Sequence, residues 1–316
     1  MRVLLAIDGS ISSDRARDLV ASLTLPAGSR VRVVGVVEHR SEVFGLPWMP
    51  GVSNDTSTLA PVPTERFVEE LEVAEREIAR PNVIVDHLLL RGHAARAIVD
   101  EAREFGADVV VIGSRGHGSF STTVLGSTSA EVVDHAPCPV LVVRRSRIET
   151  ILLAEDGSAG ADAAAKVVDA MPILAGIPVT VVSVAEAGIP FAGAVPGTYE
   201  QVMEPYSEPI ESSHQQCGEL AGRRGDWLAR DGRPVDCEVR DGDPAAEIVA
   251  AVAARGTDLV VVGTRGHTGL TRMILGSVAR NVLIHAPCSV LVVHQGAASS
   301  RQEEDPAVVA GGVGRR

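Results

Sequence analysis

The sequence predicts an α/β fold that occurs twice along the chain. Short apolar runs rich in valine alternate with amphipathic segments, which is typical of parallel strands covered by helices. Apolar residues make up 45% of the 316 residues and aromatic residues only 3%, a balance that favours buried parallel strands over an all-β barrel. Residues 109–143 recur as residues 259–293, with about half of the aligned positions identical. These observations predict two α/β domains of ordinary size.

In the first half, five short apolar runs predict strands. They span residues 3–7, 31–37, 83–90, 109–112 and 140–143. Apolar residues at helical spacing predict a helix after each of the first four strands. The first helix carries Ala16, Leu19, Val20 and Leu23, and the second spans about residues 64–79. The third carries Ala95, Ile98, Val99 and Ala102, and the fourth begins at Gly126 and Ser127. The polar, proline-bearing segment 38–63 is long enough to be a lid.

The second half repeats this order from a strand at 151–154 onwards, at a nearly constant offset, which indicates an internal duplication. We therefore expect one domain over residues 1–145 and a second over residues 149–295. Residues 296–316 lack periodicity and are expected to be a disordered tail. In each domain, strand and helix alternation predicts a parallel sheet with right-handed crossovers and helices on both faces.

Ligands bind sheets of this kind beyond the carboxyl ends of the strands, where the strand order reverses. Asp8 follows the first strand of the first half, and a glycine-rich loop follows the fourth strand. Asp156 and a second glycine-rich loop take the same positions in the second half. If the first and fourth strands are neighbours, each aspartate meets its glycine loop in one crevice.

Composition and charge exclude several classes of function. The formal net charge is −12 and no basic block is present, so we expect neither a nucleic-acid nor a membrane partner. Lys166 is the only lysine, which argues against lysine chemistry. The four cysteines have no zinc spacing and favour a reduced, cytoplasmic location. The run 3–7 is too short for the core of a signal peptide, and no apolar run is long enough to span a membrane.

The glycine-rich loops have the layout of a phosphate site. Each copy has a glycine, two residues, a second glycine, nine residues and then Gly-Ser at the start of a helix. The motif residues are Gly113, Gly116, Gly126 and Ser127 in the first copy and Gly263, Gly266, Gly276 and Ser277 in the second. Glycines let an anion approach the unpaired amides of a helix N-terminus. The alternative is that Ser127 only caps its helix and the glycines only permit turns.

Other polar groups near these loops also have two readings. Asp8 and Asp156 can accept hydrogen bonds from sugar hydroxyls, or they can cap the helices that follow them. Basic side chains inside the loops can neutralise phosphate charge, or they can simply be solvated. These basic residues are Arg115, His117, Arg265 and His267.

The two His-Ala-Pro-Cys tetrads at 135–138 and 285–288 are interpreted as structural. A histidine near a helix C-terminus interacts favourably with the helix dipole, and proline ends the helix. Cysteine then enters an apolar strand as a small buried side chain. A reactive thiol is disfavoured, because nothing nearby would clearly lower the thiol pKa.

Taken together, these motifs resemble the ATP-binding branch of the universal stress proteins, in a tandem arrangement that covers everything except the tail. The resemblance rests on the glycine spacing, on Asp8 and Asp156, and on the turns Gly92-His93-Ala94 and Gly242-Asp243-Pro244. Such turns commonly carry proline, which the first copy replaces with Ala94.

The resemblance implies two Rossmann-like domains of the adenine nucleotide alpha hydrolase type. Each would be a five-stranded parallel sheet of order 3-2-1-4-5, and the two domains would pair through their fifth strands. Asp8 and Asp156 would contact ribose or adenine, Val36 and Val184 would meet the adenine ring, and the glycine loops would hold ribose and phosphates.

Our hypothesis is a cytoplasmic protein that binds one ATP per domain, together with Mg²⁺, and acts as a nucleotide-responsive stress regulator. The sequence has neither a P-loop nor a G-x-S-x-G motif, and no catalytic base is evident. We therefore expect no enzyme activity beyond weak ATP hydrolysis. Two alternatives remain: a slow ATP hydrolase or adenylyl-transferring enzyme that uses the same crevice, and a module that mainly mediates association, with nucleotide absent or vestigial. Besides pairing of its own two domains, a homodimer is a further expected association.

Overall fold

The structure is a computed structural model that describes residues 1–38, 64–116, 125–186, 199–264 and 275–294. Residues 39–63 of the proposed lid, residue 295 and the predicted tail at 296–316 lie outside the described residues.

The described residues of the first repeat form five strands and four helices in the predicted order. The strands are β1 (Arg2–Ala6), β2 (Ser29–Val37), β3 (Val83–Arg91), β4 (Val109–Gly113) and β5 (Val140–Val143). The helices are α1 (Ile11–Ser22), α2 (Thr64–Ile78), α3 (Ala94–Phe105) and α4 (Ser127–His135). The predicted apolar positions of α1, namely Ala16, Leu19 and Val20, are buried, which confirms its amphipathic pattern.

The second repeat follows the same plan. Its strands are β6 (Ile151–Ala154), β7 (Val179–Ala185), β8 (Val235–Asp241), β9 (Leu259–Gly263) and β10 (Ser289–Val293). Its helices are α5 (Ala159–Ala170), α6 (Tyr199–Ala229), α7 (Pro244–Arg255) and α8 (Ser277–His285), with a short 3₁₀ turn, η2 (Pro172–Leu174), after α5. The clearest departure is α6, which has 31 residues where α2 has 15.

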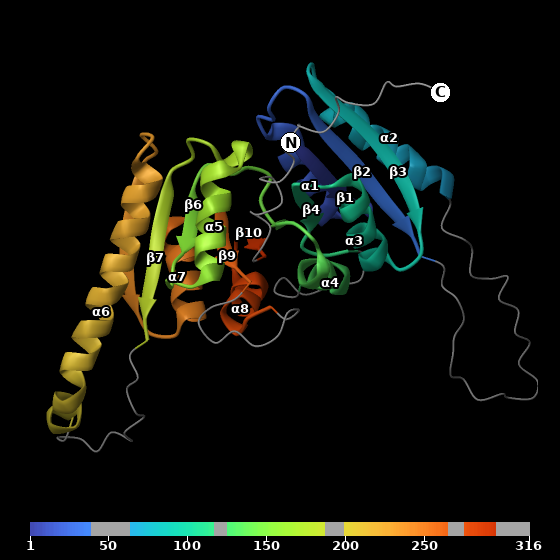
Figure 1. The fold of residues 1–316 in the computed structure, drawn as a ribbon. Helices are drawn as coiled ribbons and strands as arrows, with labels where there is room; N and C mark the ends of the chain where they lie inside the picture. The colour runs from blue at the N-terminus through green and yellow to red at the C-terminus, as the bar shows by residue number, and fades with distance from the viewer. Residues whose placement is uncertain (39–63, 117–124, 187–198, 265–274, 295–316) are drawn as a thin grey trace, which may run out of the picture.

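All ten strands form one sheet, in the order β3-β2-β1-β4-β5-β10-β9-β6-β7-β8. Strand pairs within each repeat are parallel, for example β1 with β4 and β6 with β9. The repeats meet at β5 and β10, which pair antiparallel with Leu141 opposite Leu291. The α/β fold with parallel strands is thus confirmed, and the two halves join through their fifth strands, β5 and β10, as expected (Figure 1).

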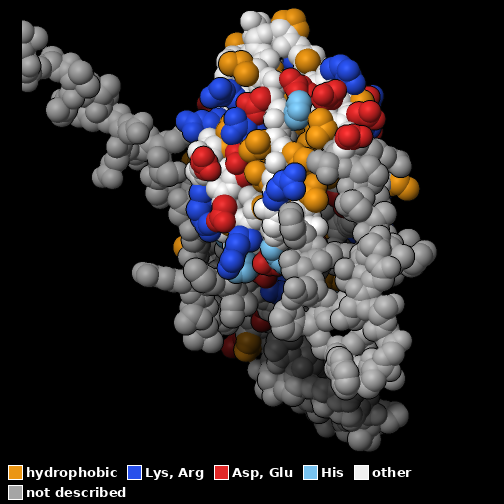
Figure 2. Space-filling view, turned by 90° about the vertical axis from the view of Figure 1, so that its right-hand side faces the viewer, with side chains coloured by type: hydrophobic (Ala, Val, Ile, Leu, Met, Phe, Trp, Pro, Cys, Tyr) orange, Lys and Arg blue, Asp and Glu red, His pale blue; other side chains and the backbone are white. Residues whose placement is uncertain are grey.

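Helices cover both faces of this sheet and enclose two hydrophobic cores. One core contains buried residues of α1, α2, α5 and α6, such as Leu19 and Leu228. The other contains buried residues of α3, α4, α7 and α8, such as Val133 and Leu283. Valine and leucine side chains alternate between the two cores along β1 and β4, because successive residues of a strand point to opposite faces. On the outer surface, acidic and basic side chains lie interspersed with hydrophobic ones over the face shown in Figure 2.

Candidate functional site

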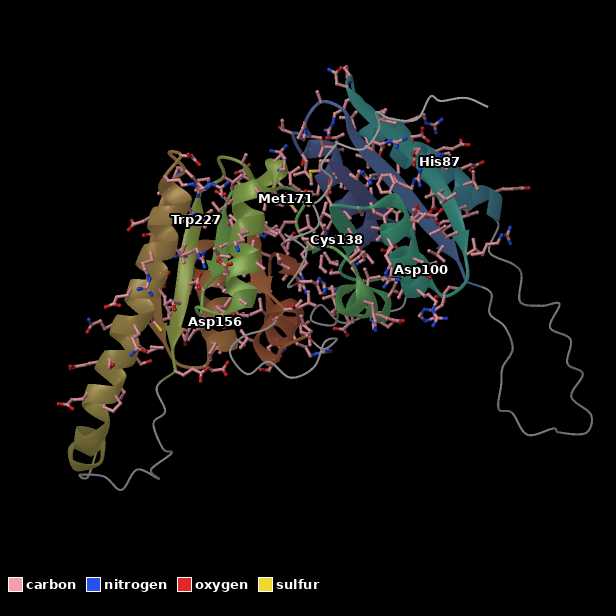
Figure 3. All side chains as sticks on the ribbon, in the orientation of Figure 1. His87, Asp100, Cys138, Asp156, Met171 and Trp227 are labelled. Atoms are coloured by element: carbon pink, nitrogen blue, oxygen red, sulfur yellow. The ribbon has the colours of Figure 1, made fainter. Side chains whose placement is uncertain are left out.

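Asp8 and the glycine loop of the first repeat lie together at the carboxyl ends of β1 and β4. These strands are neighbours, with Ala6 paired to Ile112, so the turns that follow them face each other. A Cβ atom built on Gly116 would lie 2.6 Å from the Asp8 carboxylate oxygen Oδ2. The absence of a side chain at Gly116 is therefore what allows the loop to approach the carboxylate. In the second repeat, Figure 3 shows Asp156 beyond the carboxyl end of β6.

The turn after β1 holds the aspartate without using it as a helix cap. Asp8 Oδ1 accepts a hydrogen bond from the Ser10 amide at 3.0 Å. Ser10 is the N-cap of α1, because its hydroxyl accepts from the Ser13 amide at 3.2 Å. The same hydroxyl donates to the Arg115 carbonyl at 3.1 Å, which ties the turn to the glycine loop. The suggestion that Asp8 caps the helix is therefore wrong, because Ser10 takes that role.

The second repeat reproduces this turn. Asp156 Oδ1 accepts from the Ser158 amide at 2.9 Å. Ser158 is the N-cap of α5 and accepts from the Ala161 amide at 3.2 Å. Because serine makes the cap in both repeats, both aspartates are exposed at the strand edge in the same conformation of the turn.

Gly113 and Gly263 have a packing role that sequence reasoning missed. A Cβ atom on Gly113 would lie 2.7 Å from the backbone carbonyl carbon of Ser12. A Cβ atom on Gly263 would come closer still to the backbone of Gly160. These two glycines therefore let the first turn of α1 and of α5 sit directly on the end of the neighbouring strand. This close approach brings the aspartate turn and the glycine loop together.

Gly126 and Gly276 are the N-cap residues of α4 and α8, and no side chain among the described residues caps these helices. The Gly126 amide donates to the Ser114 carbonyl at 2.9 Å, and the Gly276 amide donates to the Thr264 carbonyl at 2.8 Å. Ser127 and Ser277 are exposed first residues of these helices. The reading of Ser127 as an N-cap is therefore wrong. The amides that follow each glycine remain the positive end of the helix dipole, which favours anions.

The first-repeat site thus combines an exposed carboxylate with a helix N-terminus a short distance away. A Cβ atom on Gly126 would lie 3.4 Å from the Arg115 Cα atom and 3.7 Å from the Gly116 amide nitrogen. The Ser129 hydroxyl donates to the Gly113 carbonyl at 2.7 Å and so fixes α4 against the end of β4. This geometry can accept hydrogen bonds at one end and bind an anion at the other.

The family model for the universal stress protein family matches residues 1–144 and, separately, residues 147–294. The chain belongs to the universal stress protein family. It is 29% identical over 311 residues to a universal stress protein of Mycobacterium tuberculosis, covering 93% of this chain and 97% of that protein. It is 35% identical over 147 residues to a universal stress protein of Thermus aquaticus, covering 45% of this chain and 97% of that protein.

A solved structure of a universal stress protein from Archaeoglobus fulgidus has a similar fold. The TM-score is 0.62 at 19% sequence identity, and the likeness covers 93% of this chain and 98% of that one. At this identity the likeness concerns the fold alone.

Of the remaining residues predicted for this tandem universal stress protein, some lie within the described residues and others lie outside them. Val36 on β2 and Val184 on β7 are half-buried and pack against the second hydrophobic core. Arg115 is half-buried and belongs to the glycine loop. The other predicted loop residues lie outside the described residues. They are His117, Arg265, Gly266 and His267.

The second universal stress domain also contains a buried ion pair that sequence reasoning missed. Glu155, directly before Asp156, has a side chain that is only 1% exposed. Its Oε2 atom accepts from Arg224 Nε of α6 at 2.5 Å, and its Oε1 atom accepts from the Gly157 amide at 2.8 Å. A signal was present in the sequence, because Glu155 interrupts the end of an apolar strand where the first repeat has Ile7.

The tetrad cysteines are buried, in agreement with their structural interpretation. Burial raises the pKa of the Cys138 thiol to about 12 and that of Cys288 to about 11. Both thiols therefore stay protonated near neutral pH and are poor nucleophiles. His135 is the last residue of α4, as expected. Figure 3 shows Cys138 close to the junction of the two repeats.

The described part of the chain shows neither a metal site nor a membrane span. No group of histidine, cysteine, aspartate or glutamate residues there could hold a metal ion by protein ligands alone. No helix in those segments is long and apolar enough to cross a membrane.

Proposed function

We propose that this universal stress protein binds ATP, one molecule per repeat, and acts as a nucleotide-responsive stress regulator. The observation that supports this proposal most directly is the repeated pairing of an exposed aspartate with a helix that begins at an uncapped glycine. In the first repeat, Gly116 lies against the Asp8 carboxylate on one side and close to Gly126 on the other.

The site offers different groups to the uncharged and the charged parts of a nucleotide. Asp8 and Asp156 accept hydrogen bonds from ribose hydroxyls, because ionised carboxylates are acceptors only. The amides after Gly126 and Gly276 bind phosphate oxygens at the helix N-termini. Val36 and Val184 offer the adenine ring an apolar side of the crevice. Arg115 adds positive charge close to the phosphates.

Mg²⁺ enters this proposal through the nucleotide. Magnesium usually keeps several waters and is bound through substrate phosphates and few protein groups. We therefore propose that it bridges phosphate oxygens of the bound ATP. Its effect would be to partly neutralise the phosphates at the helix N-terminus.

The proposal is tested by replacing both helix-start glycines with aspartate, as Gly126→Asp and Gly276→Asp. Gly126 has a φ of −65° and Gly276 a φ of −60°, which any residue can adopt. Aspartate is also a favoured N-cap, so the helices should keep their stability. Its carboxylate would take the amides and repel phosphate. We expect calorimetric titration to show two ATP molecules per chain for the wild type, one for each single variant, and none for the double variant.

A matched control separates this effect from a general effect of added charge. Gly222 lies in α6, and a Cβ atom added there would have nothing within 4 Å, so Gly222→Asp should bind ATP like the wild type. Equal ATP affinity of the wild type and the double variant would refute the proposed site. The same samples, incubated for hours with ATP and Mg²⁺, report whether any turnover accompanies binding.

A further inference from the structure

Arg144, the residue after β5, reaches out of the first repeat into the second. Its Nη2 atom donates to the Leu283 carbonyl of α8 at 2.5 Å, and its Nη1 atom donates to the Cys288 carbonyl at 3.2 Å. Its backbone amide donates to the Ser289 hydroxyl at 3.1 Å. The guanidinium therefore holds the C-terminal end of a helix that belongs to the other repeat.

His294, the residue after β10, makes the reciprocal contact. Its Nε2 atom lies 2.8 Å from the Val133 carbonyl of α4. Arg144 and His294 occupy equivalent positions in the two repeats, and so do Val133 and Leu283. The contacts are thus crossed, because each repeat supplies the side chain that holds the helix of the other.

These carbonyls lie in the last turn of short helices. Carbonyls in a last turn lack amide donors within the helix and are satisfied by external groups. Positive charge at this end is also favourable for the helix dipole. Each of α4 and α8 has nine residues and is therefore about 14 Å long. The end held by the other repeat is therefore close to the end that begins at Gly126 or Gly276.

The two helices face each other across the junction of the repeats (Figure 1). A cavity of about 210 Å³ between them is lined by Leu125 and Leu275, the residues directly before the two helix-start glycines. Asp134 of α4 and Arg280 of α8 also line it and form an ion pair at 3.5 Å. The crossed contacts at the ends of α4 and α8 therefore add to the Asp134–Arg280 ion pair in joining the two repeats beside this cavity.

We propose that each repeat positions the phosphate-binding helix of the other, with Arg144 acting on the second nucleotide site and His294 on the first. This inference rests on the proposed function. Both residues are positioning residues, since they contact the far end of the helix and not the nucleotide. Losing the contact removes one of the restraints that position the helix relative to its glycine loop, and binding must then order it again.

The experiment measures ATP affinity by calorimetry with one site blocked. In the Gly126→Asp background only the second site remains, and Arg144→Ala should weaken ATP binding there about five-fold, the effect of losing its one hydrogen bond to α8. His294→Ala should leave it unchanged. In the Gly276→Asp background the pattern should reverse. The conservative changes Arg144→Lys and His294→Gln keep a donor and should restore most of the affinity.

The outcomes separate this inference from the proposed function. If neither single-site background binds ATP, the proposed function fails. If both bind ATP but each replacement acts equally on the two sites, on the site of its own repeat, or on neither, the crossed positioning is refuted. Thermal unfolding of every variant identifies loss of fold. The lysine and glutamine variants keep the test valid if an alanine variant does not fold.

Discussion

The two repeats have the same strands and turns, but they differ in the side chains that lie directly before and against the turn that holds Asp8 or Asp156. In the first repeat, half-buried Ile7 ends the apolar run of β1, and the equivalent residue of the second repeat is buried Glu155. Ala74 of α2 is fully buried, and its equivalent in α6 is Arg224, the partner of Glu155. An apolar pair has thus been replaced by an ion pair at the same place in the fold. Duplicated strands and turns can keep their geometry while the side chains beneath them change in kind.

The two repeats also connect the neighbouring helices in opposite ways. In the first repeat the cation comes from α1, where Arg17 pairs with Glu77 of α2 at 2.8 Å. In the second repeat it comes from α6, where Arg224 pairs with Asp162 of α5 at 3.3 Å. The first repeat has a cavity of about 320 Å³ between Ile7, α1 and α2. The buried charge of the second repeat attaches its long helix directly to the strand that carries the candidate site.

The largest expected effect comes from breaking the buried pair with Arg224→Ala. This change leaves the Glu155 carboxylate, whose side chain is 1% exposed, without its charged partner. Removing one partner of a buried pair costs about 3–5 kcal/mol. Urea unfolding should show a loss of free energy of unfolding in this range. A loss below about 1 kcal/mol, the level of an exposed pair, would show that the pair does not stabilise the second repeat.

The matched variant combines Glu155→Ile with Arg224→Ala and so recreates the residues of the first repeat. Replacing a buried ion pair with apolar residues is often neutral or stabilising. We expect the double variant to recover most of the free energy of unfolding lost by Arg224→Ala. If it is as unstable as the single variant, the two repeats are not interchangeable at this position.

A smaller effect is expected from adding a methyl group where α1 and α5 pack on the strand ends. Gly113→Ala and Gly263→Ala each place a Cβ atom against helix backbone, which cannot move aside as a side chain would. Overpacking of this kind costs about 1–3 kcal/mol. Urea unfolding should show the larger loss for Gly263→Ala, because its Cβ atom would come closer to its neighbour. Equal stability of both variants and the wild type would contradict this packing role.

Much of the fold could be predicted because its signals are local. The apolar runs at β1 and β4 mark buried strands, and the spacing of Leu19 and Val20 marks the inner face of α1. The internal repeat then places the second half. The meeting of Asp8 with the glycine loop followed from the neighbouring positions of the first and fourth strands, which is a topological rule and needs no side-chain detail.

What could not be predicted depends on contacts between residues far apart in the sequence. Arg144 and Leu283 are separated by 139 residues, and Arg224 and Glu155 by 69. Periodicity within one segment carries no information about such pairs. Likewise, the identity of the α1 cap required knowing that Ser10, and not Asp8, faces the helix amides.

The length of α6 was hidden for a different reason. Pro205 and Pro209 lie inside it, and proline removes an amide donor and usually breaks a helix. Gly218, Gly222 and Gly225 lower its intrinsic helix propensity further. Packing against β7 and β8 overrides the low helix propensity of the glycine-containing part of α6.

The smallest expected effect distinguishes two kinds of glycine within α6. Gly222 has nothing within 4 Å of an added Cβ atom, whereas a Cβ atom on Gly225 would lie 2.5 Å from Cys237 Sγ of β8. Gly222→Ala should therefore stabilise the protein by up to about 1 kcal/mol through helix propensity. Gly225→Ala should lose this gain, because the methyl group collides with the thiol. Thermal unfolding of the two variants measures the difference in stability between them.

This pair of variants also tests how the helix of each repeat packs against its edge strand, β3 in the first repeat and β8 in the second. At the positions equivalent to Gly225 and Cys237, the first repeat has Glu75 and His87, joined side chain to side chain at 2.5 Å. The first repeat thus joins helix and strand through two polar side chains, whereas the second repeat packs the helix backbone closely against the strand. If Gly225→Ala were as stable as Gly222→Ala, α6 would have room to move away from β8, and the close approach of helix and strand would not be a requirement of the second repeat.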